Sequence, residues 1–194
     1  MSARRPARAT PMAEVLLHEE AAPPDAALLD RLAALSTAAL SDSMERLSGA
    51  PGLMPVAWPL PSGTRMAGPA LTVRTAPGDN LAIHKAVDLA RPGDILVVDA
   101  WGYSDRAVVG GLLVRYARAQ GIAGLVVDGA VRDLVDLVEL GLPVFSRAVT
   151  HVGPYKNGPG ELRGPVGIGG TVVAQGDVVV GDEDGVVVVP QARL

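Results

Sequence analysis

Between residues 71 and 140 the chain alternates short apolar runs with stretches of helical periodicity, and this alternation limits its fold more than any other feature. The apolar runs occupy residues 71–75, 95–98 and 125–127, and the stretches that follow them occupy residues 80–91, 108–120 and 131–140. Glycine or proline ends each helical stretch. A strand followed by a helix, three times in succession, predicts right-handed crossovers and a parallel sheet with helices packed on it. We therefore expect an α/β fold.

The segment before this repeat predicts an arm and two short helices. Residues 1–24 mix Arg, Ala and Pro without periodicity, which is typical of a flexible N-terminal arm. Leucines at helical spacing behind a potential cap at Asp25 indicate a first helix. A second helix is expected to follow Ser41 and to end at Gly49, before a Pro-rich connection at residues 51–61.

The segment after the repeat has a different pattern. Valine runs at residues 171–173, 178–180 and 186–189 are separated by Gly and Asp, which predicts short antiparallel strands. We expect residues 25–194 to form one domain, because a chain of this length can bury a sufficient core by itself.

Composition narrows the class of protein. The hydrophobic share is 48% but the aromatic share is only 3%, so the core must consist of Val, Leu, Ile and Ala. The absence of cysteine fits a reducing compartment. A formal net charge of −4 offers no broad basic face for nucleic acid, and no apolar run reaches the roughly 20 residues of a membrane helix. We expect a cytoplasmic protein without a nucleic-acid or membrane partner.

Two strand-to-helix corners are the candidate binding positions, because ligands of open parallel sheets collect beyond the carboxyl ends of the strands. The first corner contains Gly110 and Gly111 at the start of a helix. These glycines could expose backbone amides that bind an anion. Equally, they could allow close packing of the helix on the sheet. A helix terminus alone contributes only about 0.3–2 kcal/mol, so a ligand needs further contacts.

The second corner supplies those contacts, since Arg132 and Asp133 follow Val131 at the same predicted edge. A single carboxylate with water ligands is a common way to hold Mg²⁺ and leaves positions open for substrate oxygens. Such a metal could bind a small 2-oxo acid and act as a Lewis acid, while the Arg132 guanidinium polarises a second oxygen.

The ordered series of residues 110–113, 128–133, 158–161 and 181–190 resembles the RraA-like family, and the resemblance covers roughly residues 28–190. This family takes in 4-hydroxy-4-methyl-2-oxoglutarate aldolases and regulators of ribonuclease E activity. The resemblance implies a swivelling β/β/α domain of mixed sheets with flanking helices. It also implies homotrimers or homohexamers with sites between subunits. The implied activity is Mg²⁺- or Mn²⁺-dependent cleavage of a 2-oxo acid to pyruvate, or decarboxylation of oxaloacetate.

Matching the family motifs implies roles for particular residues. Asp133 would be the metal ligand and Arg132 the catalytic and substrate-binding residue. The substrate carboxylate would be held by the amides of Gly110, Gly111, Leu112 and Leu113.

The chain departs from the aldolase pattern at one position. The aldolases carry an aspartate 21 residues before the arginine, and here that position is Gly111. In the aldolases the acid orients a metal-bound water for proton transfer, and general acid–base help is worth about 10²–10⁴ in rate. Asp99, Asp105 or Asp128 could substitute if the fold brought one of them to the site.

Three functions follow. We expect a metal-dependent lyase. The alternatives are a non-catalytic regulator that binds a protein partner and a diverged lyase or isomerase with room for a bulkier substrate group. Among the remaining candidates, His84 is expected at the surface or in a subunit contact, and His151 in an ordinary loop. Trp101 and Tyr103 would fill a subunit interface or line a pocket.

Overall fold

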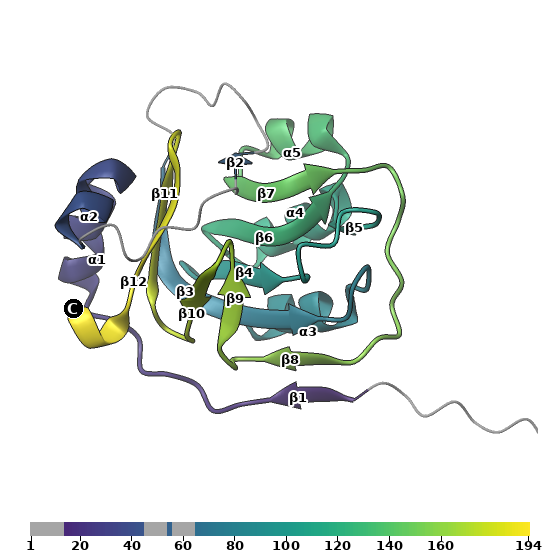
Figure 1. Ribbon diagram of the computed structural model, residues 1–194, viewed down its shortest axis with the longest axis horizontal. Coiled ribbons are helices and arrows are strands. Elements are labelled where there is room, and N and C mark those ends of the chain that lie inside the picture. The colour runs from purple at the N-terminus through teal and green to yellow at the C-terminus, as the bar shows by residue number, and fades with distance from the viewer. Residues whose placement is uncertain (1–13, 45–53, 56–64) are drawn as a thin grey trace, which may run out of the picture.

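The computed structural model describes residues 14–44, 54–55 and 65–194, and its framework is a mixed sheet in which β1, β8, β3, β4, β6, β7 and β2 are neighbours in that order (Figure 1). In chain order these strands are β1 (Val15–Leu17), β2 (Met54–Pro55), β3 (Met66–Thr75), β4 (Ile95–Asp99), β6 (Gly124–Val131), β7 (Val144–Val149) and β8 (Gly160–Leu162). The remaining strands are β5 (Ala107–Val109), β9 (Val166–Ile168), β10 (Thr171–Val173), β11 (Val178–Asp182) and β12 (Gly185–Val189). The helices are α1 (Ala26–Ala33), α2 (Thr37–Ser43), α3 (Leu81–Leu89), α4 (Gly111–Ala119), α5 (Leu134–Leu140) and the 3₁₀ turn η1 (Gln191–Arg193).

The predicted parallel sheet is confirmed, because β3, β4, β6 and β7 pair in parallel. Helices α3, α4 and α5 lie between these strands in the chain, as the alternation predicted. The valine runs near the C-terminus also pair as expected, since β11 is antiparallel to β12 and β10 is antiparallel to β9.

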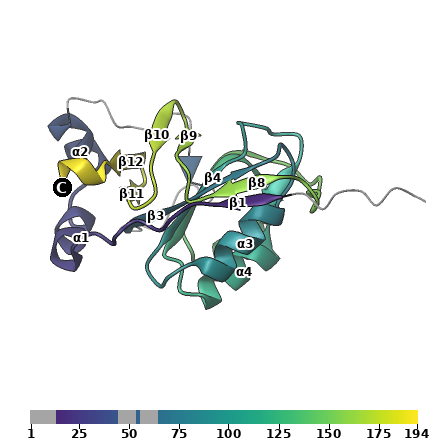
Figure 2. The same ribbon diagram turned by 90° about the horizontal axis from the view of Figure 1, so that it is seen from below.

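The all-apolar strands are explained by burial on both faces. In β4, Leu96 and Val98 belong to the core beneath the helices, whereas Ile95 and Val97 belong to a second core on the opposite face. Helices α3 and α4 cover the first face, and β9 and β10 lie over the second (Figure 2). The same alternation recurs in β12, whose residues divide between this second core and a third core under α1 and α2. The fold is thus a set of layers with helices on both outer sides, and the expected mixed α/β architecture is confirmed.

Two predicted helices begin later than expected. Val108 and Val109 belong to β5, which pairs with β6, so α4 begins only at Gly111. Val131 ends β6, where it pairs with β7, so α5 begins only at Leu134. The residues at both predicted helix starts therefore belong to strands at one edge of the sheet. Arg132 and Asp133 form the link between β6 and α5.

The N-terminal region differs from the expectation in two places. Residues 15–17, part of the predicted arm, form β1 parallel to β8. Helix α2 begins at Thr37 rather than after Ser41, because Ser36 caps it by accepting a hydrogen bond from the Ala39 amide. The predicted first helix is confirmed with its Asp25 cap. Residues 1–13, the predicted helix end at Gly49 and most of the connection at 51–61 lie outside the described residues. Within the described ranges, every helix is too short or too polar to span a lipid bilayer.

The buried Asp182 ties α2 to the β11–β12 hairpin. Its carboxylate accepts hydrogen bonds from the Thr37 amide at 2.8 Å, from the Thr37 hydroxyl at 2.6 Å and from the Asp184 amide at 3.0 Å. Burial acts to raise the pKa of Asp182, but these hydrogen bonds and the charge of Arg65 outweigh it, so the pKa lies below the ordinary value. The charged form therefore stabilises the folded chain.

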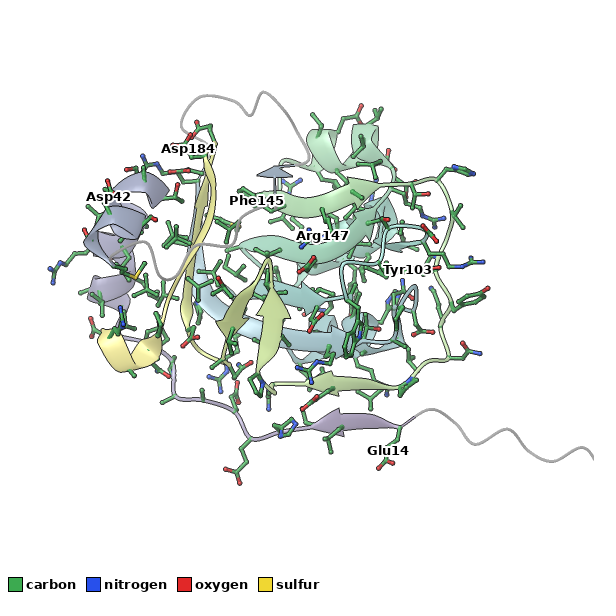
Figure 3. The ribbon with its side chains drawn as sticks, in the orientation of Figure 1. Glu14, Asp42, Tyr103, Phe145, Arg147 and Asp184 are labelled. Carbon is green, nitrogen blue, oxygen red and sulfur yellow. The ribbon has the colours of Figure 1, made fainter. Side chains whose placement is uncertain are left out.

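We expect Asp182→Asn to lower the free energy of unfolding at pH 7 by about 1–3 kcal/mol, because buried donors lose a charged acceptor. The folded-state pKa is the lower one, so this stabilisation is complete above the ordinary Asp pKa of about 3.9 and is lost as the pH falls through the folded-state value. Urea unfolding at successive pH values should show the wild type and the variant converge in acid. Asp184→Asn, at the exposed tip of the same hairpin (Figure 3), is the control and should change little. A difference that persisted unchanged in acid would contradict this account.

Candidate functional site

A cavity of about 260 Å³ lies at the edge of the sheet where β5 and β6 end. Its walls are formed by the start of α3, the start of α4, the link between β6 and α5, and the loop at residues 153–156. Among the residues that line it are Asn80, His84, Val109, Gly110, Leu112, Leu113, Arg132, Asp133, Gly153 and Lys156. The structure therefore brings the two predicted corners together in one cavity.

Asp133 has an unusual backbone conformation that directs its side chain toward the other corner. Its φ of 63° lies in the left-handed region, which aspartate tolerates better than most residues. The side chain does not cap α5, although it occupies the capping position. Instead, Asp133 Oδ2 accepts a hydrogen bond from the Gly111 amide at 3.0 Å and lies 3.6 Å from Arg132 Nε. Asp133 therefore does not act as a helix cap, and its strained conformation marks a candidate functional residue.

Gly110 makes this arrangement possible because it leaves room for the charged pair. A Cβ at Gly110 would lie 2.6 Å from Asp133 Oδ2 and 3.0 Å from Arg132 Cγ. Any larger residue would displace the carboxylate or the guanidinium. The glycine thus serves close packing, but the packing is against the candidate site rather than against the sheet.

The amides of the first corner divide into two groups. The Gly111 amide is engaged by Asp133, so it orients the carboxylate. The amides of Leu112 and Leu113, in the first turn of α4, precede the first residue whose amide is bonded within the helix, Val114. These two amides are the ones available to an anion in the cavity.

Asp136 occupies the space next to Gly111, where the aldolase aspartate is absent. A Cβ at Gly111 would lie 2.6 Å from Asp136 Oδ2. A carboxylate from the first turn of α5 is therefore present beside the backbone position that lacks one. Neither Gly111 nor Asp136 lines the cavity itself. Gly110 and Leu112, the chain neighbours of Gly111, do line it. Sequence reasoning missed Asp136, although its spacing of three residues after Asp133 places it within one helical turn of that carboxylate.

Another wall of the cavity comes from α3, and sequence reasoning missed it as well. Asn80 and His84 lie one helical turn apart and both line the cavity, so His84 is not only a surface residue as predicted. The pKa of His84 is lowered by burial and by the nearby Lys156 charge, against an opposing effect of Asp88. The imidazole is therefore neutral at neutral pH.

The loop that carries Lys156 is fixed to α3 by a buried carboxylate. Asp79 Oδ2 accepts hydrogen bonds from the amides of Asn157 and Gly158, both at 2.7 Å. Its Oδ1 accepts one from the Leu81 amide at 2.9 Å. On the other side of the loop, Arg106 donates to the Gly153 carbonyl at 2.9 Å. These hydrogen bonds hold the loop in place, and Lys156 on this loop lines the cavity.

The carboxylates proposed as substitutes for the missing aspartate have other partners. Asp99 accepts a hydrogen bond from the Gly167 amide at 3.3 Å, and Asp128 accepts one from the Gly169 amide at 2.8 Å. These contacts attach the β9–β10 hairpin to the sheet, on the face opposite α3 and α4. Asp128 also pairs with Arg147. Arg147 lies on β7 (Figure 3). Neither carboxylate lines the cavity, nor does the exposed Asp105.

Trp101 and Glu161 belong to a separate region of the surface. Trp101 lines an apolar hollow with Leu16, Pro77 and Glu161, and its indole donates to the Thr75 carbonyl at 2.9 Å. Glu161 pairs with Arg74 at 2.9 Å and accepts from His18 at 2.5 Å. The structure therefore does not bring these residues to the cavity of Arg132.

Comparisons with known proteins identify the family to which the chain is similar. The family model described as RraA-like, Aldolase/RraA, matches residues 37–188. A protein of Halalkalibacterium halodurans, provisionally named 4-hydroxy-4-methyl-2-oxoglutarate aldolase, is 40% identical over 159 residues, which cover 82% of this chain and 74% of the relative. A relative from Burkholderia mallei with the same provisional name is 38% identical over 142 residues, covering 73% of this chain and 86% of the relative.

Solved structures show the same fold. Streptomyces coelicolor RraAS2, described as an unusual member of the RNase ES inhibitor RraA protein family, aligns with a TM-score of 0.79 and 34% identity. That alignment covers 89% of this chain and 88% of the other. The RNA-processing inhibitor RraA from Thermus thermophilis aligns with a TM-score of 0.71 and 33% identity, covering 80% and 93% of the two chains. The sequence motifs, the layered fold and these matches together show that the chain belongs to the RraA-like family.

Proposed function

We propose that this protein is a divalent-metal-dependent lyase that acts on a small 2-oxo acid and releases pyruvate or a related oxo acid. The observation that carries the proposal is the pairing of Arg132 and Asp133 at the cavity, where Asp133 adopts a left-handed conformation and its carboxylate is held by the Gly111 amide. The provisional aldolase names of the relatives support a lyase.

The donor set fits a metal that keeps much of its water shell. Among the described residues, no group of three or more His, Cys, Asp or Glu side chains could hold an ion. Asp133 is the one carboxylate among the described residues that line the cavity, and its Oδ2 is the oxygen that accepts from Gly111. The other oxygen, Oδ1, remains to ligate a hard cation such as Mg²⁺ or Mn²⁺. A bound cation would supply Lewis-acid stabilisation of charge developing on the substrate.

The protein's own residues have distinct tasks in this proposal. The Arg132 guanidinium donates to the 2-oxo oxygen and stabilises the negative charge that develops there. The Leu112 and Leu113 amides hold the substrate carboxylate at the N-terminus of α4. Asp136 takes over the proton-transfer function of the aspartate that Gly111 lacks.

We also propose that the protein assembles as a homotrimer or homohexamer with its sites between subunits. Leu112, Val135 and Val138, near the cavity on α4 and α5, have exposed fractions of 78%, 72% and 55%. Large apolar side chains exposed beside a functional cavity are typical of an interaction surface.

A second candidate is a non-catalytic regulator that binds a protein partner. It is favoured by the two solved relatives described as inhibitors and by the glycine at position 111. A third candidate is a diverged lyase or isomerase that acts on a bulkier substrate. This candidate requires free space beside Gly111, and Asp136 occupies part of that space.

Removal of metal separates the lyase from these alternatives. We expect the purified chain to release pyruvate from 4-hydroxy-4-methyl-2-oxoglutarate or from oxaloacetate, to lose this activity with EDTA and to regain it with excess Mg²⁺ or Mn²⁺. Coupled lactate dehydrogenase measures the pyruvate. Turnover that survives EDTA would contradict the metal dependence, and the absence of turnover with both substrates would contradict the lyase.

A further inference from the structure

Strand β1 lies at one edge of the large sheet, beside β8 (Figure 1). In the described part of the chain, β1 pairs with β8 alone. At the two ends of β1, the Glu14 carbonyl and the His18 amide form hydrogen bonds to β8, at 3.3 and 3.0 Å. Because the peptide groups of successive residues in a strand point to opposite sides, Val15 and Leu17 direct their N–H and C=O groups away from the sheet. Such an edge is a template for a further strand.

An apolar hollow lies on each face of the sheet beside this edge. The Trp101 hollow, on the face opposite α3, has a volume of about 560 Å³ and is lined from β1 by Leu16. The Leu17 hollow, on the face of α3, has a volume of about 440 Å³ and is lined by Val15, Leu17 and Leu89. Leu16 and Leu17 are 53% and 52% exposed, so each hollow presents apolar surface to solvent at β1.

The polar groups in the wall of the Trp101 hollow already have partners. Arg74 donates to Glu161 at 2.9 Å, so the two charges neutralise one another. The Trp101 amide donates to Asp99 at 2.9 Å and holds a left-handed backbone with a φ of 62°, which is rare for so large a residue. Strained backbone of this kind is typical of functional sites, and the exposed indole adds to the apolar surface. The hollow is therefore suited to an apolar group and not to an ion.

The charges at the ends of β1 favour a basic partner. Glu14 and Glu19 are both exposed, and they flank the apolar centre of the strand. In the wall of the Leu17 hollow, Lys85 and Asp88 balance one another. A second copy of this chain would bring the same two glutamates to the edge, and exposed like charges repel within a Debye length of about 8 Å. A segment with Lys or Arg at its ends would be attracted instead.

We propose that the β1 edge is a docking site for another protein, which adds an extended segment as a new strand beside β1. The peptide groups of this segment bond to Val15 and Leu17, and its alternate side chains enter the Trp101 hollow and the Leu17 hollow. The segment is therefore apolar at its centre and carries Lys or Arg at both ends. This inference does not depend on the cavity of Arg132, so it applies whether or not the chain is a lyase.

The experiment titrates a fluorescein-labelled peptide, Arg-Val-Leu-Val-Arg, with the full-length chain and follows fluorescence anisotropy. We expect a Kd on the order of 100 µM or tighter, because burial of two large apolar side chains supplies that affinity. N-methylation of the two valines and N-methylation of the leucine remove donors from opposite sides of the extended peptide. Since only one side faces β1, one of these peptides should bind about tenfold more weakly and the other should match the parent peptide.

Substitutions in the protein test the side chains and the charges. Leu17→Asp places a charge in one hollow and should weaken the peptide at least about tenfold. Val172→Asp changes an exposed valine on β10 that lines neither hollow, so it is the matched control and should retain the wild-type affinity. Glu14→Gln combined with Glu19→Gln should weaken the peptide about threefold to tenfold and remove most of the dependence of its affinity on salt.

Several outcomes would overturn the inference. They are a wild type that shows no binding up to about 1 mM, two N-methylated peptides that lose affinity equally, and a Leu17→Asp variant that binds as the wild type does. Sedimentation of the chain without peptide tests the other occupant. If Leu17→Asp dissociates an assembly that Val172→Asp preserves, a second copy covers the edge and the proposed partner is wrong.

Discussion

Arg132→Ala is expected to lower kcat/KM for pyruvate release by about 10²–10³-fold, the range observed when one preorganised donor to a developing oxyanion is removed. The side chain of Arg132 is 40% exposed, and its ion pair with Asp133 is correspondingly weak in water. Its loss should therefore change the unfolding temperature little. The effect should fall on the chemical step, and kcat should decrease more than KM rises.

Two further variants separate geometry from charge. Arg132→Lys keeps the positive charge but loses the planar fork of donors, so it should recover only a small part of the activity. Arg115→Ala removes an exposed arginine from α4, outside the cavity, and should behave as the wild type. If pyruvate assays gave Arg132→Ala a rate within about threefold of the wild type, a role for this guanidinium in the reaction would be excluded. A tenfold change in rate corresponds to about 1.4 kcal/mol of activation free energy.

The sequence was sufficient to predict the parts of the fold that depend on local pattern. The runs around β4 and β6 are apolar at every position because both faces of the sheet are buried, and this pattern identified the parallel core. The cap at Asp25 identified α1 for a similar reason, since the capping bond to Leu28 spans only three residues. Local signals of this kind need no knowledge of the partner across the fold.

The errors concern elements whose structure depends on distant residues. Val108 has a side chain that suits a helix or a strand, and pairing of β5 with β6 decides in favour of the strand. Residues 15–17 have no periodicity of their own, yet they pair with β8 some 145 positions along the chain, as from Val15 to Gly160. Such pairings are set by tertiary context, which overrides intrinsic preference in strands.

The candidate site shows the same division. Arg132 and Asp133 could be selected from sequence because they are adjacent at a strand-to-helix corner, but the roles of Gly110 and Gly111 could not be separated. That separation required the contacts of each glycine, with Asp133 in one case and with Asp136 in the other. The sequence identifies Asn80 only as the start of a helix, because the burial that leaves its oxygen unpaired depends on the folded cavity wall.

Asp136→Ala is expected to lower the turnover number by about 10²–10⁴-fold, since it removes the carboxylate to which we assign proton transfer. The exchange of the pyruvate methyl protons with deuterium, followed by NMR, should fall by a similar factor because it reports proton transfer without bond cleavage. Glu139→Ala, an exposed carboxylate one turn further along α5, is the matched control and should leave both rates unchanged.

The decisive variant moves the carboxylate from α5 to α4. Gly111→Asp alone should fold poorly, because its Cβ would lie 2.6 Å from Asp136 Oδ2 and 2.8 Å from Asp136 Cβ. Combining Gly111→Asp with Asp136→Gly removes both of these atoms and restores one acid at the same place, so we expect the double variant to regain at least about tenfold of the rate lost in Asp136→Ala. A folded double variant as inactive as Asp136→Ala would show that the two positions are not equivalent. Full activity in Asp136→Ala would show that the proton is carried by another group, and His84, which lines the cavity and has a lowered pKa, would then be the residue to replace.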